Sequence, residues 1–289
     1  MMTNLDPAAA FAPHRARLAR IAYRMLGSVA EAEDIVQDSY LRWHQLDRGA
    51  VENAGAYLAR MVTRLCLDHL KSARVRRETY IGPWLPEPVV APEADIGEEA
   101  ENLTLALMMA LERLSPLERA AFLLHDVFGM GFDDVSEAID RDPAACRQLA
   151  ARARTHVQAA KPRFPVSAEQ GRDIAAAFFA AARQGDLGAL RGILAADVIV
   201  YSDGGGKRTA AGRPVEGLER VLHFFGSLAR KPDFATPDIL YTGPIDGLPG
   251  YITRESEDTL QSMAFEIENG RIKTIYVMRN PDKMRHLPF

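Results

Sequence analysis

Long hydrogen-bond donors share one face of a predicted helix near the middle of the chain. Asp142-Pro143 offers a helix cap and a proline at the first helical position, and apolar residues then recur at helical spacing. The apolar stripe is Cys146, Leu149, Ala150, Ala153 and Val157, and the opposite face shows Ala144, Arg147, Gln148, Ala151, Arg152, Arg154 and Thr155. Arginine and glutamine donate to base edges and phosphates, and alanine permits close approach. The face therefore predicts contact with DNA.

Two shorter helices are predicted in front of this one. Ser115-Pro116-Leu117-Glu118 forms a capping box with a proline at the first helical position, and the helix it opens stops at Phe128-Gly129-Met130-Gly131. A second helix carries Phe132, Val135 and Ile139 on one side. The three together predict a helix-turn-helix, whose last helix lies in the major groove. The alternative is an ordinary helical bundle.

The composition is that of a cytoplasmic globular protein. The chain has 289 residues, of which 47% are hydrophobic and 26% charged, and neither a signal peptide nor a membrane-spanning run is expected. The two cysteines, Cys66 and Cys146, take apolar helix positions and are interpreted as buried thiols in a reducing compartment. The scattered histidines lack metal-ligand spacing, so no metal or cofactor is predicted.

The net charge of −4 disfavours nucleic acid, but the distribution of charge favours it. Residues 57–77 hold six basic side chains and one acidic one, residues 144–163 hold five basic and no acidic ones, and residues 87–101 hold six acidic and no basic ones. The first basic set is Arg60, Arg64, Lys71, Arg74, Arg76 and Arg77. Two basic helices separated by an acidic linker suit two contacts on one duplex. They could also be solvated helix faces.

The first third of the chain predicts three amphipathic helices. One ends at Gly27, one begins at Ser28 and reaches about Leu46, and one runs from Ala56 to about Arg76. The second has a polar face with one apolar side chain, formed by Asp34, Gln37, Asp38, Leu41 and Gln45. Such a face is either solvated or docks a partner helix.

Three segments resemble bacterial sigma factors of the extracytoplasmic-function (ECF) type. The run from Ala32 to Trp43 resembles their core-polymerase-binding helix, which implies that Asp34, Gln37, Asp38, Leu41 and Arg42 bind core RNA polymerase. Tyr57-Leu58-Ala59-Arg60 with Leu67-Asp68-His69-Leu70-Lys71 resembles their promoter-melting helix, and Leu111 to Arg119 with the helix-turn-helix resembles their minus-thirty-five-reading domain. There are two departures: Arg64 replaces a common asparagine, and Phe132-Asp133-Asp134-Val135-Ser136 is unusually acidic.

Three short motifs resemble the ECF subgroup that carries a SnoaL-like C-terminal domain. They are Trp84-Leu85-Pro86-Glu87-Pro88, Asp203-Gly204-Gly205-Gly206-Lys207 and Asn280-Pro281-Asp282-Lys283. The resemblance implies that these motifs dock on one another and that the extra domain regulates the sigma domains. The expected boundaries are sigma domain 2 over 1–80, an acidic proline-rich linker over 81–101, sigma domain 4 over 102–163 and the SnoaL-like domain over 167–289. The linker should be extended and mobile, with Trp84 docked.

The C-terminal part predicts an α+β unit in a multidomain protein. Helices are expected around Ile174 to Ala181, Leu187 to Leu194 and Val215 to Phe225. Strands are expected over Val198 to Ser202, Ile239 to Thr242, Gly250 to Arg254, Thr259 to Glu268 and Arg271 to Met278. Asn269-Gly270 predicts a hairpin turn between the last two. The resemblance names the unit a SnoaL-like cone, with helices on a curved antiparallel sheet and a pocket that could hold a small ligand.

Three other functions fit the sequence less well. Asp203-Gly204-Gly205-Gly206-Lys207 is not a phosphate-binding P-loop, because Tyr201 and Arg208 stand where that motif needs a glycine and a hydroxyl residue. A SnoaL-like enzyme fused to a sigma core would need an acid and a base in the pocket, for which Asp203, His223, Tyr201 and Glu255 are candidates. A ligand-sensing one-component regulator would leave the first third of the chain unexplained. The prediction is a sigma factor without catalytic residues.

Overall fold

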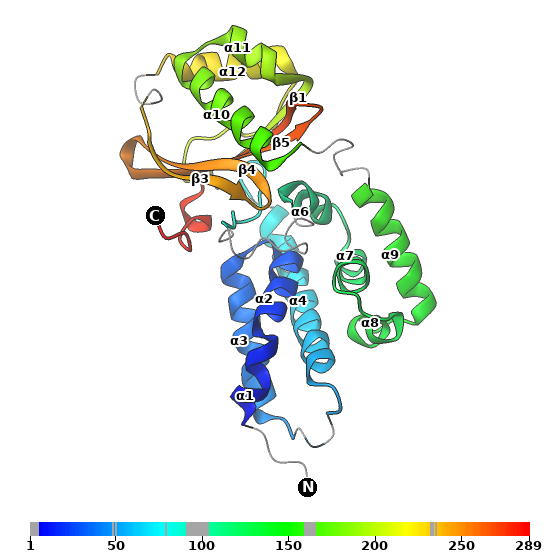
Figure 1. Cartoon of the computed structure of the whole chain (residues 1–289). Coiled ribbons are helices and arrows are strands. Elements are labelled where there is room, and N and C mark those ends of the chain that lie inside the picture. The colour runs from blue at the N-terminus through cyan, green and yellow to red at the C-terminus, as the bar shows by residue number, and fades with distance from the viewer. Residues whose placement is uncertain are drawn as a thin grey trace. The chain divides into compact units, whose positions relative to one another are not determined.

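A computed structural model of the chain describes residues 6–47, 49, 51–78, 80–90, 104–158, 166–231, 234 and 236–289, without the side chains of 73–78 and 257. The helices in order are α1 (Pro7–Phe11), α2 (Arg15–Leu26), α3 (Val29–Gln45), α4 (Ala54–Glu78), α6 (Leu105–Glu112), α7 (Pro116–Phe122), α8 (Phe132–Ile139), α9 (Pro143–Gln158), α10 (Ala168–Gln184), α11 (Leu187–Ile193) and α12 (Leu218–Ala229). The strands are β1 (Leu194–Asp203), β2 (Val215–Glu216), β3 (Asp238–Ile245), β4 (Leu248–Glu255), β5 (Thr259–Glu268) and β6 (Arg271–Met278) (Figure 1).

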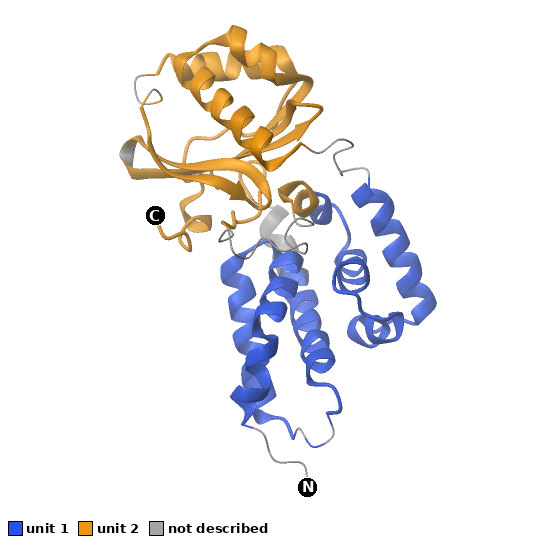
Figure 2. Cartoon of the chain, viewed as in Figure 1, with its two compact units in different colours: residues 1–78, 110–160 blue, residues 79–109, 161–289 orange. Residues whose placement is uncertain are grey.

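Contacts divide the chain into two compact units (Figure 2). Unit 1 contains residues Met1–Glu78 and Ala110–Ala160, and unit 2 contains Thr79–Met109 and Lys161–Phe289. The segment expected to be a linker therefore clusters with the C-terminal unit. Helix α6 begins in unit 2 and ends in unit 1.

The predicted helix caps of unit 1 are confirmed. The hydroxyl of Ser28 accepts from the backbone N–H of Glu31, and Gly27 ends α2 with a left-handed φ of 72°. Ser115 and Glu118 form the complete capping box at the start of α7. The end of that helix continues as a π-helical turn, Leu123–Val127. Local sequence thus defines where these helices begin and end.

The predicted helix-turn-helix consists of α7, α8 and α9. The predicted apolar stripe of α9 is buried over its whole length, comprising Cys146, Leu149, Ala150, Ala153 and Val157. Helices α2, α3 and α4 form the other part of unit 1, around a core that includes Ile21, Val36, Trp43, Leu58 and Val62. Both cysteines are free and buried, and burial raises the pKa of each thiol, as expected for structural thiols.

Unit 2 is built on one six-stranded sheet in the order β2-β1-β6-β5-β4-β3. The hairpin of β5 and β6 has its predicted bounds, and Asn269 and Gly270 take the positive φ values, 54° and 70°, that a tight hairpin turn needs. The expectation of a wholly antiparallel sheet is wrong at one pairing, because β1 runs parallel to β6. Leu194 and Val215, assigned to helices from the sequence, lie in β1 and β2.

Both faces of this sheet are buried. On one face, α10, α11 and α12 pack over alternate residues such as Phe265, Ile275 and Val277. On the other face, Leu85 and Leu105 pack against the strand residues that alternate with those of the first face. This second cluster contains Leu85, Leu105, Ile245, Leu248, Ile252, Ala264, Tyr276, Met278, Met284 and Leu287. The consecutive apolar residues of Met263–Phe265 in β5 and Ile275–Met278 in β6 follow from this double burial, since a strand with one wet face would alternate.

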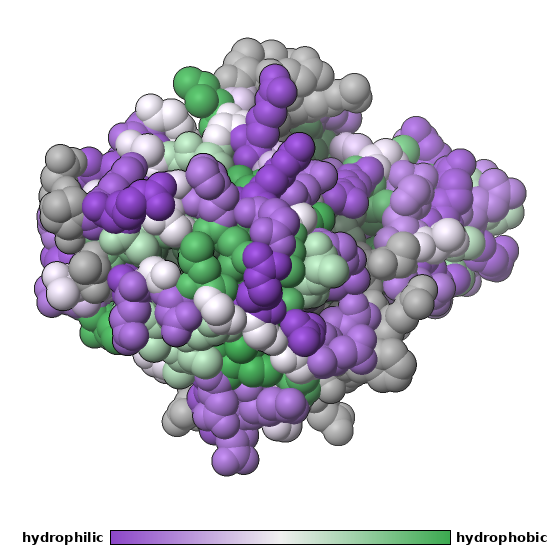
Figure 3. Space-filling model, turned by 90° about the horizontal axis from the view of Figure 1, so that it is seen from above, coloured by the Kyte–Doolittle hydropathy of each residue, from purple (hydrophilic) through white to green (hydrophobic). Residues whose placement is uncertain are grey.

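The surface of the protein is mostly hydrophilic, as the charged fraction of the sequence predicts. Viewed from above, hydrophilic side chains surround small, separate patches of hydrophobic residues (Figure 3). Among the described residues, the large hydrophobic side chains that are exposed are Leu41, Ile81, Leu187 and Ile239. No helix in the described part of the chain is long and apolar enough to span a membrane.

Candidate nucleic-acid and docking sites

The predicted recognition face of α9 is open to solvent. Ala144, Arg147, Gln148, Ala151 and Arg152 are all exposed, and Arg154 is half-buried. The guanidinium of Arg147 lies over the ring of Phe132, 5.5 Å from its centroid. Nε of Arg152 lies 3.1 Å from Oε1 of Glu118 in α7.

Arg154, toward the C-terminal end of this face, forms an ion pair within the helix-turn-helix. Arg154 donates from Nε to Oδ1 of Asp126 at 2.5 Å. Arg147 and Gln148 are exposed on the side of α9 opposite its buried stripe. The arrangement can place both side chains against base edges, while Arg154 braces the helix.

The predicted basic face of α4 is partly engaged by α8. Nη1 of Arg60 lies 2.7 Å from Oε2 of Glu137 and 3.8 Å from Oδ1 of Asp134. Nη2 of Arg64 donates to the carbonyl oxygen of Glu137 at 2.5 Å. Further along the helix, Lys71 pairs with Asp68. The side chains of Arg74, Arg76 and Arg77 lie outside the described residues.

The face of α3 predicted to bind polymerase is exposed along its length. Its five members, Asp34, Gln37, Asp38, Leu41 and Arg42, are all open to solvent. Leu41 keeps 51% of its surface exposed, although the opposite side of the helix is buried through Ile35, Val36 and Trp43. Leu41 therefore lies open between polar neighbours, where a partner helix can bury it.

The three short motifs converge on Asp203, whose side chain is fully buried at the end of β1. Its Oδ1 accepts from the hydroxyl of Tyr80 at 2.5 Å, and its Oδ2 accepts from the backbone N–H of Leu85 at 2.9 Å. Nζ of Lys283 lies 2.8 Å from the same Oδ2. Burial, followed by the hydrogen bond and charge of Asp203, raises the pKa of Tyr80, so this hydroxyl stays protonated and donates.

Lys283 completes the contact from the C-terminal side. Its ammonium donates to the carbonyl oxygen of Leu85 at 2.6 Å and lies 4.1 Å from the ring centroid of Trp84 and 4.8 Å from that of Tyr80. Nδ2 of Asn280 donates to the hydroxyl of Tyr80 at 2.8 Å. We call Asp203, Asn280 and Lys283 the clamp, because together they hold residues 80–85 through one buried, hydrogen-bonded ion pair.

The glycines of the second motif make room for the clamp. Gly205 and Gly206 have φ values of 59° and 71°. A Cβ on Gly205 would lie 2.3 Å from Nδ2 of Asn280, and one on Gly206 would lie 2.8 Å from Cδ1 of Ile81. Lys207 forms an ion pair with Asp282 beside them. The absence of side chains therefore allows the loop to lie against Asn280 of the third motif and against Ile81, which precedes the first motif.

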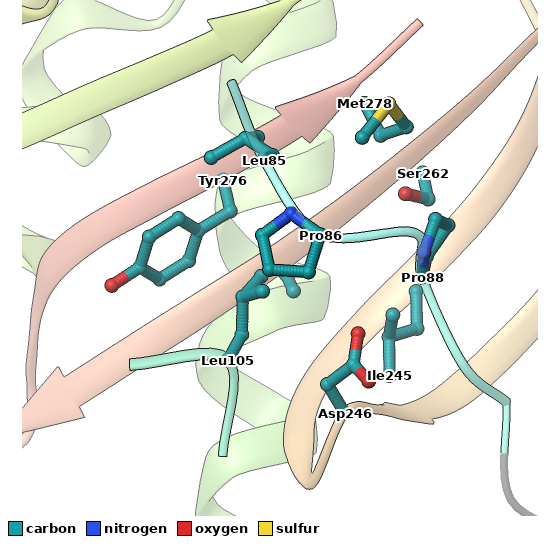
Figure 4. A pocket seen from close by; sticks show the side chains of 10 residues that line it. Leu85, Pro86, Pro88, Leu105, Ile245, Asp246, Ser262, Tyr276 and Met278 are labelled. Carbon is teal, nitrogen blue, oxygen red and sulfur yellow. The ribbon is translucent and has the colours of Figure 1, made fainter. Parts of the chain in front are cut away.

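Residues 85–90, which follow the part of the chain held by the clamp, pack against the sheet. Leu85, Pro86 and Pro88 lie against the sheet residues Tyr276 and Met278, as Figure 4 shows. Glu87 is also buried, and the carbonyl of Pro88 contacts Nε2 of His286 at 2.8 Å. Val90 bridges to Ile245 at the edge strand β3. The expectation of a mobile linker is therefore wrong for residues 81–90, because apolar burial and buried hydrogen bonds hold them. The remainder of the predicted linker, 91–101, lies outside the described residues.

The catalytic candidates do not share a site. A cavity of about 510 Å³ opens between α12 and the sheet, and its lining includes Glu255 but not Asp203, Tyr201 or His223. Glu255 is engaged by Arg183, with Nη2 to Oε1 at 2.6 Å and Nη1 to Oε2 at 2.9 Å. Asp203 belongs to the clamp, and His223 is exposed on α12. Asp203, Tyr201, His223 and Glu255 therefore do not line a common cavity.

Sequence reasoning missed several residues that build the docking site. Tyr80 bonds to two clamp residues, and its position beside the predicted linker, next to the apolar Ile81, was the available signal. Asp246 at the β3–β4 turn accepts from the N–H of Val89 through its side chain and from the N–H of Leu105 through its carbonyl. Nothing local in the sequence marks Asp246, because both partners come from far along the chain.

Comparisons with known proteins agree with this arrangement. Residues 10–76 match the family model of Sigma-70 region 2, and residues 104–157 match that of Sigma-70, region 4. The ECF RNA polymerase sigma factor SigJ of Mycobacterium tuberculosis is 36% identical over 95% of this chain and 92% of its own length. The probable ECF RNA polymerase sigma factor SigI of the same species is 32% identical over 98% and 97%.

The fold has a solved counterpart over nearly its full length. The crystal structure of Mycobacterium tuberculosis SigJ superposes with a TM-score of 0.77 and 33% sequence identity, covering 97% of this chain and 99% of that one. Both sigma regions and the C-terminal unit are included in that coverage. The chain therefore belongs to the extracytoplasmic-function RNA polymerase sigma factors and carries the additional C-terminal cone.

Proposed function

We propose that this sigma factor acts in the cytoplasm, where it binds core RNA polymerase through α3 and directs it to specific promoters. Asp34 and Asp38 give the docking face negative charge, Gln37 gives it a neutral amide, and Leu41 gives it an apolar centre that water covers in the free protein. Burying that leucine against a partner supplies affinity, while the surrounding charges select the partner.

The two basic helices divide promoter recognition between them. Arg147, Gln148 and Arg152 of α9 read the minus-thirty-five element in the major groove, since all three are exposed on a helix face that carries no acidic residue of its own. Arg60, Arg64 and Lys71 of α4 hold the backbone of the melted minus-ten strand, whose unstacked bases are received by the preceding loop.

The cone regulates these domains within the same chain and does not catalyse a reaction. The observation that carries this proposal is the clamp: Lys283 donates to Asp203 and to the backbone of Leu85, so one C-terminal side chain holds the segment between the sigma domains. Shortening the free part of that segment narrows the range of separations that the sigma domains sample. Tethered partners meet at roughly millimolar effective concentration, so docking persists even when it is weak.

The test is transcription from a promoter recognised by this chain, with purified core polymerase and three altered proteins. One ends near Ser167, one carries alanine at Gly204 to Gly206, and one carries Trp84→Ala. We expect all three to change promoter activity, with the loop and Trp84 variants changing it in the same direction. Normal activity in all three, with the sigma domains folded by circular dichroism, would show that the cone does not regulate transcription.

A further inference from the structure

Arg147 is supported by a residue that lies outside the recognition helix. Its guanidinium carbon lies over the ring of Phe132, the first residue of α8, at 5.5 Å from the ring centroid. A cation at this distance is attracted by the negative face of an aromatic ring. Arg147 is exposed and Phe132 is half-buried, so the contact lies on the surface proposed to approach DNA.

The ring of Phe132 is itself held in place by the turn between α7 and α8. It stacks on the imidazole of His125, with ring centroids 3.9 Å apart and an angle of 28° between the ring planes. Nδ1 of His125 in turn donates to the carbonyl oxygen of Met130 at 2.8 Å. Phe132 therefore offers Arg147 a ring whose orientation is set by the fold, as precise placement of a binding group requires.

The support of Arg152 is different in kind. Its Nε lies 3.1 Å from Oε1 of Glu118, whose Oε2 accepts from the backbone N–H and the hydroxyl of Ser115. The hydrogen bond from that hydroxyl is the main cause that lowers the pKa of Glu118, so the carboxylate stays charged and offsets the charge of Arg152. The neutral ring of Phe132 takes up no N–H donor of Arg147, which forms no hydrogen bond or ion pair with the described residues.

We propose that Phe132 is a positioning residue for promoter specificity: it holds the guanidinium of Arg147 in the orientation that donates two hydrogen bonds to one guanine of the minus-thirty-five element. This role depends on the proposed function of α9 in reading that element. An aromatic ring attracts the guanidinium as a whole, so the edge with two parallel N–H donors stays available to O6 and N7 of guanine. Restricting the side chain before DNA arrives also lowers the entropy lost on binding.

The contact acts on specificity more than on total affinity. Phosphate contacts supply most of the affinity of a protein for DNA, and they do not depend on the exact orientation of one side chain. A guanidinium that swings freely can reach a phosphate or another base, whereas a fixed one favours the guanine in front of it. Loss of the ring should therefore weaken base preference at one position and leave the other positions unchanged.

The experiment measures base preference with the holoenzyme. Core RNA polymerase carrying the full chain selects from fragments of a recognised promoter in which the minus-thirty-five positions are randomised, and the bound fragments are sequenced. Phe132→Leu keeps an apolar side chain but removes the aromatic face, so we expect the preference for guanine to fall about two- to fivefold at one position. Arg147→Ala should abolish the preference at the same position, and the double variant should lose no more than Arg147→Ala alone.

Three further changes separate positioning from folding. Trifluorophenylalanine at position 132 nearly keeps the size of the ring but removes the negative charge of its face, so it should lower the guanine preference even if Phe132→Leu fails to fold. Phe132→Tyr keeps the aromatic face and should keep the preference. Phe128→Leu makes the same aromatic-to-leucine change under Arg24, whose guanidinium lies 4.8 Å from that ring centroid, and should leave the preference unchanged.

The outcomes distinguish the positioning role from the proposed function. Unchanged guanine preference in the trifluorophenylalanine protein, while Arg147→Ala loses that preference, would overturn the positioning role and leave base reading by α9 standing. An equal weakening of all sequences by Arg147→Ala would overturn base reading by this residue as well. A lost preference for a base other than guanine would overturn the assignment of the contacted base.

Discussion

Arg60 of α4 and Glu137 of α8 form an ion pair of 2.7 Å between the two DNA-binding parts of unit 1. Arg64 binds the carbonyl of the same glutamate, so the basic helix expected to hold the minus-ten strand is covered by an acidic helix of the helix-turn-helix. A phosphate and Glu137 cannot occupy the same guanidinium edge. If Arg60 holds the minus-ten strand as proposed, promoter binding must open this ion pair.

Opening this contact should strengthen binding of single-stranded DNA by the free protein. Glu137→Lys removes the ion pair and repels Arg60. Because an exposed pair is worth about 0.2–1 kcal/mol, we expect a gain of up to about fivefold in affinity for a minus-ten oligonucleotide, measured by fluorescence anisotropy. Asp133→Lys makes the same charge change at an exposed position of α8 and is the control. Equal gains from both variants would indicate a general charge effect.

Breaking the clamp by removing one partner should be costly. Asp203→Asn leaves the ammonium of Lys283 buried without its counter-ion, a change that costs about 3–5 kcal/mol when a buried pair is broken. Combining it with Lys283→Met removes both charges and should recover a substantial part of that loss. Urea unfolding followed by circular dichroism measures both, and additive losses would show that the two residues do not interact.

The glycine loop should tolerate alanine differently at each position. Gly205→Ala places a Cβ against Asn280 at a positive φ, and Gly204→Ala places one 2.1 Å from the carbonyl oxygen of Arg208, so both should release residues 80–90 to protease. Gly206→Ala is also strained by its positive φ, but its closest contact is Cδ1 of Ile81, the end of a flexible side chain, so its effect should be milder. Gly212→Ala, with no neighbour within 4 Å among the described atoms, is the control. Equal proteolysis of all four variants would remove the loop from the docking contact.

A double substitution tests whether the exposed face of α3 binds core RNA polymerase. Asp38→Lys combined with Leu41→Lys reverses a charge and removes the apolar centre at two exposed positions, so folding should be retained. We expect the double variant to lose co-purification with core RNA polymerase while its unfolding temperature changes little. Retention of polymerase at the parent's level would assign docking to another surface.

Base reading by α9 is tested by specificity. Arg147→Ala should lose discrimination at one or two positions of the minus-thirty-five element, about 1–3 kcal/mol for a bidentate base contact. Gln158→Ala, exposed at the end of the same helix, should leave discrimination unchanged. The measurement is competition between promoter variants at one salt concentration. An equal loss across all sequences would make Arg147 a phosphate contact.

The sequence alone determined the local structure and the family. The caps at Ser28 and Ser115, the buried stripe of α9 and the Asn269-Gly270 turn depend on residues within one or two turns of each other, so periodicity and cap chemistry suffice to predict them. The motifs around Trp84, Asp203 and Asn280 indicated docking, but their partners could not be derived from spacing.

Only the tertiary structure decided which distant groups meet. Tyr80 and Asp203 lie 123 positions apart, and Asn280 bonds to Tyr80 across 200, so no local pattern encodes either contact. The parallel pairing of β1 with β6 and the cover over the second face of the sheet are likewise long-range. A buried charge needs a counter-ion, however far along the chain that counter-ion lies. For Asp203 it is Lys283, near the C-terminus.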